Sequence, residues 1–173
     1  IKGLIDYPFS SMNSDFMDVF LASSCKFCIG TSSGYISLPP MFGKPLLLVN
    51  LLNTFEYFSY KDTDIFLPKT LVHKKNNKLV PLEKLFNFEI GNLVQEKSYE
   101  DKDIKIQNNT PEEILAATEE MLSFVDKKDY NNYSNDYNSK FKETLSNLYK
   151  NYSDYPLKPL ANLPSSFLQK YYS

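Results

Sequence analysis

The chain has 173 residues, of which 42% are hydrophobic and 23% charged, and its formal net charge is −2. This length is enough for one domain with a hydrophobic core. The charge offers no basic stripe for nucleic acid, and the longest apolar run, Pro45–Leu52, is far shorter than the roughly 18 residues that span a bilayer.

Two cysteines are too few for a disulfide framework. Cys25 and Cys28 lie in a predicted strand, where residues three apart point to opposite faces. The single histidine, His73, is distant in the sequence. We therefore expect two packing cysteines in a reducing compartment, and no metal site.

The first residues, Ile1–Ile5, have the composition of a short strand, and Asp6-Tyr7-Pro8 ends it because Pro8 disfavours helix at Tyr7. Asp6 would then follow the carboxyl end of a strand, where α/β sheets bind ligands. It is either a turn former or a ligand-binding residue. Because the chain opens inside a predicted strand, we expect it to be the C-terminal part of a longer protein.

Ser14 is a good N-cap for a helix through about Ser23. Asp15 and Asp18 fall in the first turn, where carboxylates complement the helix dipole. We prefer this role at the start of a helix to the interpretation of Asp15 and Asp18 as a catalytic pair.

The next stretch predicts a strand at Cys25–Ile29, a loop, a short helix limited by Pro39-Pro40, and a buried strand at Pro45–Asn50. The loop, Gly30-Thr31-Ser32-Ser33-Gly34, offers small side chains, three hydroxyls and backbone N–H groups. Such a loop suits an anion, most often phosphate. No acidic residue occurs between Asp18 and Glu56, as expected for a phosphate site. A buried βαβ crossover without any ligand would lack acidic residues as well.

Asn50 and Asn53 follow the buried strand, either as ligand-binding residues or as turn formers. The aromatic stretch Thr54–Leu71 contains a predicted strand at Ile65–Leu67, and its rings could stack on a base or sugar, or belong to the core or to an interface. His73 begins a basic, Asn-rich segment that is typical of a solvated loop, with a general base as the alternative.

Later segments predict a helix at Pro81–Phe88, an exposed linker at Lys97–Asp103 and a strand at Ile104–Gln107. Thr110-Pro111-Glu112-Glu113 is a capping box with proline at the first helical position, and it begins a helix that runs to about Asp126. We expect Lys127–Lys150 to be mostly helical.

Ser165–Tyr172 is a candidate terminal helix. The order of elements predicts an α/β fold: a Rossmann-like parallel sheet flanked by helices over residues 1–126. A helical C-terminal extension over residues 127–173 should pack back on this domain.

Several segments, in this order and spacing, give the chain a family resemblance. They are Ile5–Pro8, Ser14–Leu21, Phe27–Gly34, Phe42–Asn50, Asp64–Lys69, the Thr110–Glu113 helix start and Ser166–Leu168. Together they span nearly the whole chain, which resembles the C-terminal domain of a GT-B-type glycosyltransferase. The closest similarity is to glycosyltransferases of bacterial surface-polysaccharide gene clusters.

The resemblance implies transfer of a sugar from a nucleotide-sugar donor to a glycan or lipid-linked acceptor. The loop Gly30, Thr31, Ser32, Ser33 and Gly34 would hold the donor diphosphate, and the other donor-site candidates are Asp6, Asn50, Asn53 and Lys69. No cofactor or metal is expected. The acceptor site and general base would belong largely to the protein's own N-terminal domain, in a cytoplasmic enzyme peripheral to the inner membrane.

One departure concerns the donor ribose. Many such folds hold it with a glutamate shortly after the loop, but Tyr35–Leu38 contains none. A sugar-nucleotide epimerase of the same fold is a related alternative. An alternative from a different class is a non-catalytic module that binds a partner protein. Its interface would lie at Phe55–Tyr60 and Phe167–Tyr172. A second α/β domain immediately upstream would favour the enzyme.

Overall fold

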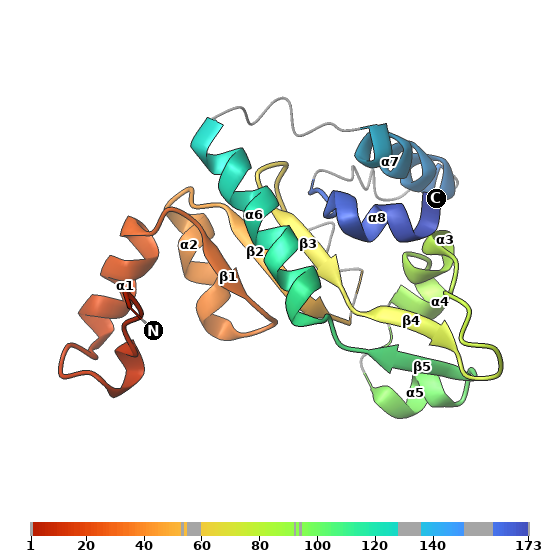
Figure 1. Cartoon of the computed structure of the whole chain (residues 1–173), viewed down its shortest axis with the longest axis horizontal. Helices are drawn as coiled ribbons and strands as arrows, with labels where there is room; N and C mark the ends of the chain where they lie inside the picture. The colour runs from red at the N-terminus through yellow and green to blue at the C-terminus, as the bar shows by residue number, and fades with distance from the viewer. Residues whose placement is uncertain are drawn as a thin grey trace.

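A parallel sheet forms the centre of the computed structural model, which describes residues 2–52, 54, 60–91, 93, 95–127, 136–150 and 161–172. Its strands are β1 (Cys28–Gly30), β2 (Leu46–Leu51) and β3 (Ile65–Pro68), in the spatial order β1-β2-β3 (Figure 1). Cys28 pairs with Leu46, and Leu48 pairs with Phe66. The predicted α/β class and the buried central strand are both confirmed, since Leu46–Val49 are all buried.

Two short helical turns connect β1 to β2. The 3₁₀ turn η2 (Gly34–Ser37) runs directly into α2 (Leu38–Met41), which has proline in its first turn. Proline is tolerated there because those N–H groups have no partner within the helix. As the sequence predicted, this helix is short.

The N-terminal segment does not form the predicted strand. Among the described residues 2–6 there is no ladder, and the Leu4 and Ile5 side chains are 68% and 67% exposed. A strand needs partners for its backbone groups, and in this arrangement the segment lies against none. The prediction of a strand at Ile1–Ile5 is therefore wrong for the described residues 2–5, and Asp6 does not follow a strand.

The first long helix is correctly predicted. After the 3₁₀ turn η1 (Tyr7–Phe9), α1 (Asp15–Ser24) begins at Ser14, whose hydroxyl accepts a hydrogen bond from the Met17 amide at 3.3 Å. In Figure 1, α1 lies at one end of the molecule, and it packs against α2.

A two-stranded antiparallel ladder extends from β3. It consists of β4 (Thr70–His73) and β5 (Ile104–Gln107), so the strand predicted at Ile104–Gln107 is confirmed, whereas His73 ends a strand rather than beginning a loop. Helices α3 (Leu82–Leu85) and α4 (Phe88–Gly91) follow β4.

The linker predicted at Lys97–Asp103 is partly helical, because α5 (Glu96–Glu100) occupies it. The many charged residues of this segment indicated exposure, but Tyr99 is fully buried. The Tyr99 hydroxyl donates to the Leu93 carbonyl at 2.8 Å. Burial raises the pKa of Tyr99 to about 12.

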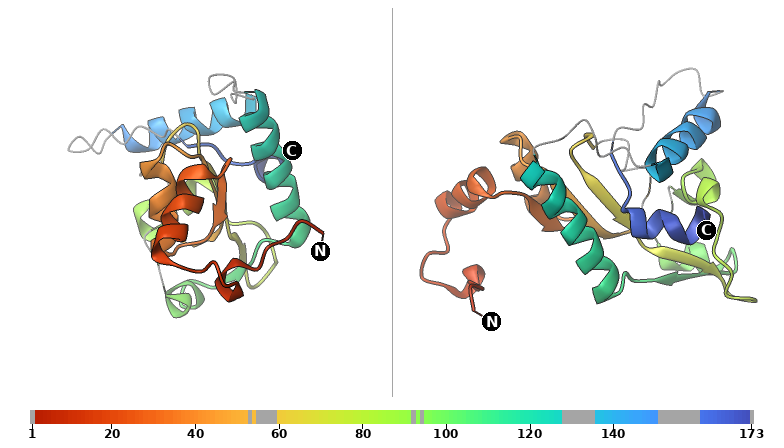
Figure 2. Two further views of the ribbon diagram at one scale, coloured as in Figure 1. Left: turned by 90° about the vertical axis from the view of Figure 1, so that its left-hand side faces the viewer. Right: turned by 45° about the horizontal axis from the view of Figure 1, so that its top comes forward.

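Helix α6 (Pro111–Lys127) covers one face of β2 and β3 (Figures 1 and 2). Its predicted capping box is present: the Thr110 hydroxyl accepts from the Glu113 amide at 3.2 Å, and the Glu113 carboxylate accepts from the Thr110 amide at 3.0 Å. The buried positions of α6 are Ala117, Met121, Phe124 and Val125.

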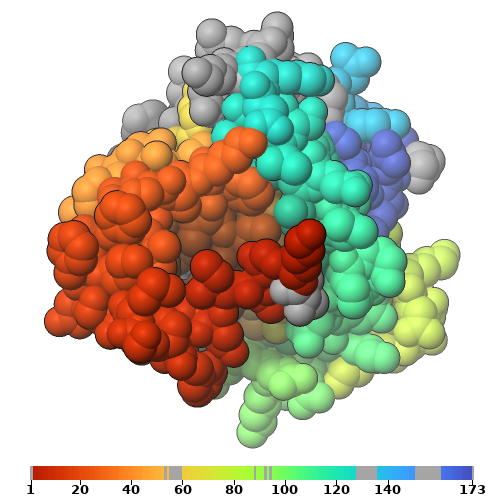
Figure 3. Space-filling model, turned by 60° about the vertical axis from the view of Figure 1, so that its left-hand side comes forward, coloured from red at the N-terminus to blue at the C-terminus, as the bar shows by residue number. Residues whose placement is uncertain are grey.

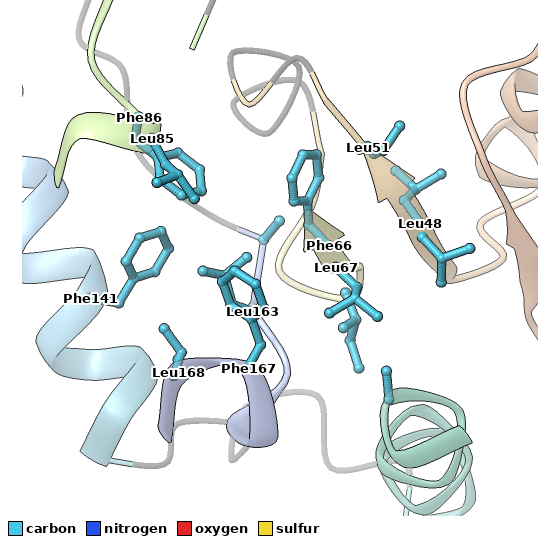
Figure 4. Packing of buried hydrophobic residues seen from close by; sticks show 14 of the residues in the cluster. Leu48, Leu51, Phe66, Leu67, Leu85, Phe86, Phe141, Leu163, Phe167 and Leu168 are labelled. Atoms are coloured by element: carbon cyan, nitrogen blue, oxygen red, sulfur yellow. The ribbon is translucent and has the colours of Figure 1, made fainter. Parts of the chain in front are cut away.

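The two C-terminal helices bury side chains in the same hydrophobic core as the sheet. Helices α7 (Asp136–Tyr149) and α8 (Ser165–Tyr172) pack together, and the ring of Phe141 meets that of Phe86 edge-on at 5.1 Å (Figure 4). Asn162 adds a single parallel bridge to β3, because its amide donates to Asp64 and its carbonyl accepts from Phe66. The terminal helix is therefore tied to the sheet by backbone hydrogen bonds.

Candidate functional site

The small-residue loop leaves the sheet at the carboxyl end of β1. Gly30 is the last residue of the strand, and Thr31, Ser32, Ser33 and Gly34 are all exposed. Ligands of open α/β sheets bind outside the carboxyl ends of the strands. The loop is thus at the carboxyl edge of the parallel sheet, where the sequence predicted it.

The two glycines of this loop have different surroundings. A Cβ on Gly30 would overlap Cδ1 of Ile36, a buried side chain of η2, so Gly30 allows the turn to pack closely on the strand end. A Cβ on Gly34 would meet nothing within 4 Å. A methyl group at the first glycine would therefore force the buried Ile36 side chain to shift, whereas the space around the second glycine is open.

Tyr35 fastens the loop to α1. Its hydroxyl donates to the Asp18 backbone carbonyl at 3.1 Å, and the Tyr7 hydroxyl donates to the Asp18 carboxylate at 2.8 Å. Partial burial raises the pKa of Tyr35, and the negative charge of Asp18 adds to this effect. Asp18 therefore connects α1 with Tyr7 on one side and with Tyr35 on the other, in addition to its place in the first turn of the helix.

The two lysines nearest the loop in sequence do not flank it in space. Lys26 and Lys44 precede β1 and β2, so they lie toward the opposite edge of a parallel sheet. Lys26 also forms an ion pair with Asp126 at the end of α6. Any anion at the loop would be held by backbone N–H groups and hydroxyls rather than by these cations.

Asn50 closes the same edge of the sheet at the end of β2. Its backbone has φ 56°, a left-handed conformation that asparagine tolerates well, and the ladder shifts register there. The Asn50 amide donates to Oδ1 of Asn109 at 2.6 Å, and the Asn109 amide donates to Oδ1 of Asn50 at 2.7 Å. Nδ2 of Asn109 donates to the Pro68 carbonyl at 2.8 Å. Asn50 thus has a structural role through its backbone amide and Oδ1.

Of the other candidate residues, only one lies at this edge of the sheet among the described residues. The Lys69 amide donates to the Leu51 carbonyl at 2.9 Å, so Lys69 lies at the carboxyl ends of β2 and β3, near Asn50. Asp6 is exposed and outside the sheet, and Asn53 is outside the described residues. The structure therefore brings the Gly30–Gly34 loop, Asn50 and Lys69 to one edge.

Asn109 and Tyr35 are site residues that sequence reasoning missed. Asn109 directly precedes the Thr110 cap of α6, and an amide between a strand and a capping box was the available signal. Its partner, Asn50, is 59 residues away in the sequence, and no local pattern identifies it.

A pocket of about 220 Å³ lies between α6 and α8. Glu113 and Lys170 form an ion pair in its wall, and Lys170 also contacts the Thr70 hydroxyl at 3.4 Å. Burial alone would raise the pKa of Glu113, but the hydrogen bonds from Lys170 and the Thr110 amide outweigh it, and the pKa is lowered. This pair holds the terminal helix against the start of α6.

The cysteines are free thiols, and partial burial raises the pKa of both Cys25 and Cys28. A raised pKa disfavours the thiolate that metals and electrophiles need, which supports a packing role. Within the residues that the structure describes, no group of three metal-binding side chains occurs, and no helix there is long and apolar enough to cross a membrane.

The molecule is thus an α/β protein with an exposed small-residue loop at the carboxyl edge of a parallel sheet. No protein-family model, curated protein or solved structure matches the chain. The loop and its surroundings therefore carry the chemistry from which a function can be inferred.

Proposed function

We propose that this chain is the donor-binding half of a GT-B-type glycosyltransferase. It would transfer a sugar from a nucleotide-sugar to a glycan or lipid-linked acceptor in surface-polysaccharide biosynthesis. The observation that carries the proposal is the position of the exposed Gly30–Gly34 loop, directly after β1 and beside the carboxyl end of β2.

The loop has the chemistry for a diphosphate. Three hydroxyls and successive backbone N–H groups are donors, and the open space at Gly34 admits a bulky anion close to the main chain. Nδ2 of Asn50 and the Lys69 ammonium are further donors at this edge. The donor diphosphate would lie across the loop with its sugar toward the partner domain.

The catalytic contribution of this half is electrostatic. Donors fixed before the reaction stabilise negative charge as the diphosphate leaves, and they need no reorganisation in the transition state. The proposal assigns the general base and the acceptor site to the protein's own N-terminal domain. It assigns no catalytic residue to the present chain.

The test is a calorimetric titration of the full-length protein with UDP-, GDP-, CMP- and TDP-sugars. Gly34→Asp should abolish binding while the fold is kept, because a Cβ at Gly34 meets open space. A carboxylate about 4 Å from a phosphate charge repels it by about 4 kcal/mol at an effective dielectric constant of about 20. Affinity should therefore fall at least about 100-fold.

Gly34→Ala is the matched control, since it adds a methyl group without charge and should keep most of the affinity. Binding of none of the four donor classes by the unsubstituted protein would contradict the proposal. So would a Gly34→Asp variant that binds as tightly as the control. Product analysis with donor alone separates transfer from epimerisation, because only an epimerase changes the sugar without an acceptor.

A second candidate, a non-catalytic partner-binding module, is favoured by exposed apolar side chains near the N-terminus. Phe16 and Phe20 of α1 stack on each other and are 77% and 47% exposed. The interface predicted at Phe167–Tyr172 is wrong in part, because Phe167 and Leu168 are buried in the core. The one predicted at Phe55–Tyr60 lies mostly outside the described residues. Nucleotide-sugar binding decides between the two functions.

A further inference from the structure

The parallel sheet has an unpaired edge at β1. In the described part of the chain, β1 pairs with β2 and no strand lies on its other side. The Cys28 amide donates to the Pro45 carbonyl at 3.0 Å. Because alternate residues of a parallel strand turn their backbone groups to opposite sides, the amide of Ile29 faces away from β2. The Ile29 side chain is 44% exposed, which is unusual for a parallel sheet.

A groove runs along this edge. It has a volume of about 320 Å³ and lies between the last turns of α1 and β1. Most of its wall is apolar, with Leu21, Ala22, Phe27, Ile29 and Tyr35 among the lining residues. Figure 3 views this side of the molecule and shows the surface hollowed between the N-terminal residues and α6. An apolar groove beside a free strand edge fits an extended apolar segment.

The chain has such a segment within reach. Leu4 and Ile5 belong to the strand predicted at Ile1–Ile5, and they expose about two thirds of their side chains. The segment continues into Tyr7, whose hydroxyl is held by Asp18 of α1. The Tyr35 hydroxyl is held by the same Asp18, so the segment starts close to the turn that follows β1.

The usual right-handedness of strand connections is consistent with a strand in this groove. A strand at residues 2–6 beside β1 would give the order 2–6, β1, β2, with each connection moving in the same direction across the sheet. Two successive right-handed crossovers place their helices on the same face. The helices concerned are α1 and α2, and these already pack against each other.

From these observations, we propose that Lys2–Asp6 docks in the groove as a fourth parallel strand on the outer edge of β1. The docked segment buries Leu4 or Ile5 against the groove and gives the Ile29 amide a backbone acceptor. The structure thus shows the segment and its binding place apart, each with exposed apolar surface.

Docking also changes the ligand-binding edge. The carboxyl end of a strand parallel to β1 lies beside the carboxyl end of β1, so Asp6 would move next to Thr31 and Ser32. A carboxylate there would repel a diphosphate bound at the loop, so docking should weaken donor binding. This consequence, unlike docking itself, rests on the proposed function.

The first test is disulfide trapping in the whole chain, with Cys25→Ser and Cys28→Ser as background. Ile29→Cys is combined with Leu4→Cys in one variant and with Ile5→Cys in the other. Neighbouring strands are about 4.8 Å apart, within disulfide reach, and successive side chains alternate in direction. One of the two variants should therefore form an intramolecular bridge at least about tenfold faster than the other.

Equal rates in the two variants, or no bridge in either, would overturn the proposal. A bridge between two chains would overturn it as well, because the groove would then take the segment of a second copy. The two variants are matched controls for each other, since they differ only in which exposed residue carries the thiol.

A second measurement needs no cysteine substitution. Hydrogen exchange at the Ile29 amide of the unsubstituted chain is compared with that of the double variant Leu4→Asp/Ile5→Asp, which changes two exposed side chains outside the described core, so that either docked face carries a carboxylate. Docking predicts exchange at least about tenfold faster in the variant, because a carboxylate in the apolar groove expels the strand. The same exchange rate in both proteins would refute docking. Either result is independent of whether the protein binds a nucleotide-sugar.

Discussion

Replacing Asn109 with alanine tests whether a side-chain amide fastens the ligand-binding edge of the sheet. Asn109 is 7% exposed, and its side chain accepts from the Asn50 amide at 2.6 Å and donates to the Pro68 carbonyl at 2.8 Å. Asn109→Ala removes both bonds, and the third bond of the cluster survives because it starts from the backbone of residue 109. Leaving a buried polar group without a partner costs about 1–3 kcal/mol.

The expected loss in the free energy of unfolding is about 2–4 kcal/mol in total, since Asn50 is half-buried and water can partly replace its bond. With a urea m-value of about 2 kcal/mol/M, the unfolding midpoint should fall by about 1–2 M. Asn108→Ala is the matched control, because Asn108 is exposed, and it should change the free energy by less than about 0.5 kcal/mol. A midpoint for Asn109→Ala within the range of this control would refute the reasoning.

Three further predictions concern stability. Gly30→Ala should destabilise the fold by about 1–3 kcal/mol in urea unfolding because its methyl group displaces Ile36, whereas Gly34→Ala should stay within about 0.5 kcal/mol; equal effects would contradict the packing argument. The folded pKa of Glu113 lies below 4.5, so its contribution is present above pH 4.5 and is lost as the pH falls through the lowered value. Unfolding curves of Glu113→Gln and the unsubstituted protein should therefore converge in acid, and a constant difference would argue against it. Tyr99→Phe should cost about 1 kcal/mol at neutral pH. Because the folded pKa is about 12 against 10.0, that contribution is complete below pH 10.0 and should disappear as the pH rises through 12, which alkaline unfolding would measure.

Local patterns predicted the elements that depend on neighbours in sequence. The capping box needs only Thr110 and Glu113, three residues apart, and both of its hydrogen bonds are present. The buried strand at Pro45–Asn50 and the proline-limited α2 are equally local, and they correspond to β2 and a single helical turn. The position of the Gly30–Gly34 loop followed from these elements.

What the sequence could not predict depends on distant partners. Asn50 had a recognisable place at the end of a strand, but its role is decided by Asn109. Tyr99 has charged neighbours in the sequence, which pointed to exposure, yet it is the buried residue of α5. The prediction of an N-terminal strand also depended on a distant partner: residues 2–6 lie against no strand in this structure, although the outer edge of β1 is unpaired among the described residues.

The single bridge between Asn162 and β3 has a consequence for synthesis of the chain. The Asn162 side chain also donates to the Asp62 carbonyl, a contact that spans 100 residues. At roughly 5–20 residues per second, a ribosome takes about 5–20 s to make that interval. During this time the Phe66 amide at the outer side of β3 has no Asn162 carbonyl to bind. A nascent chain with an open edge can pair with another one, so a chaperone that covers β3 until residue 162 emerges should increase the yield of folded protein.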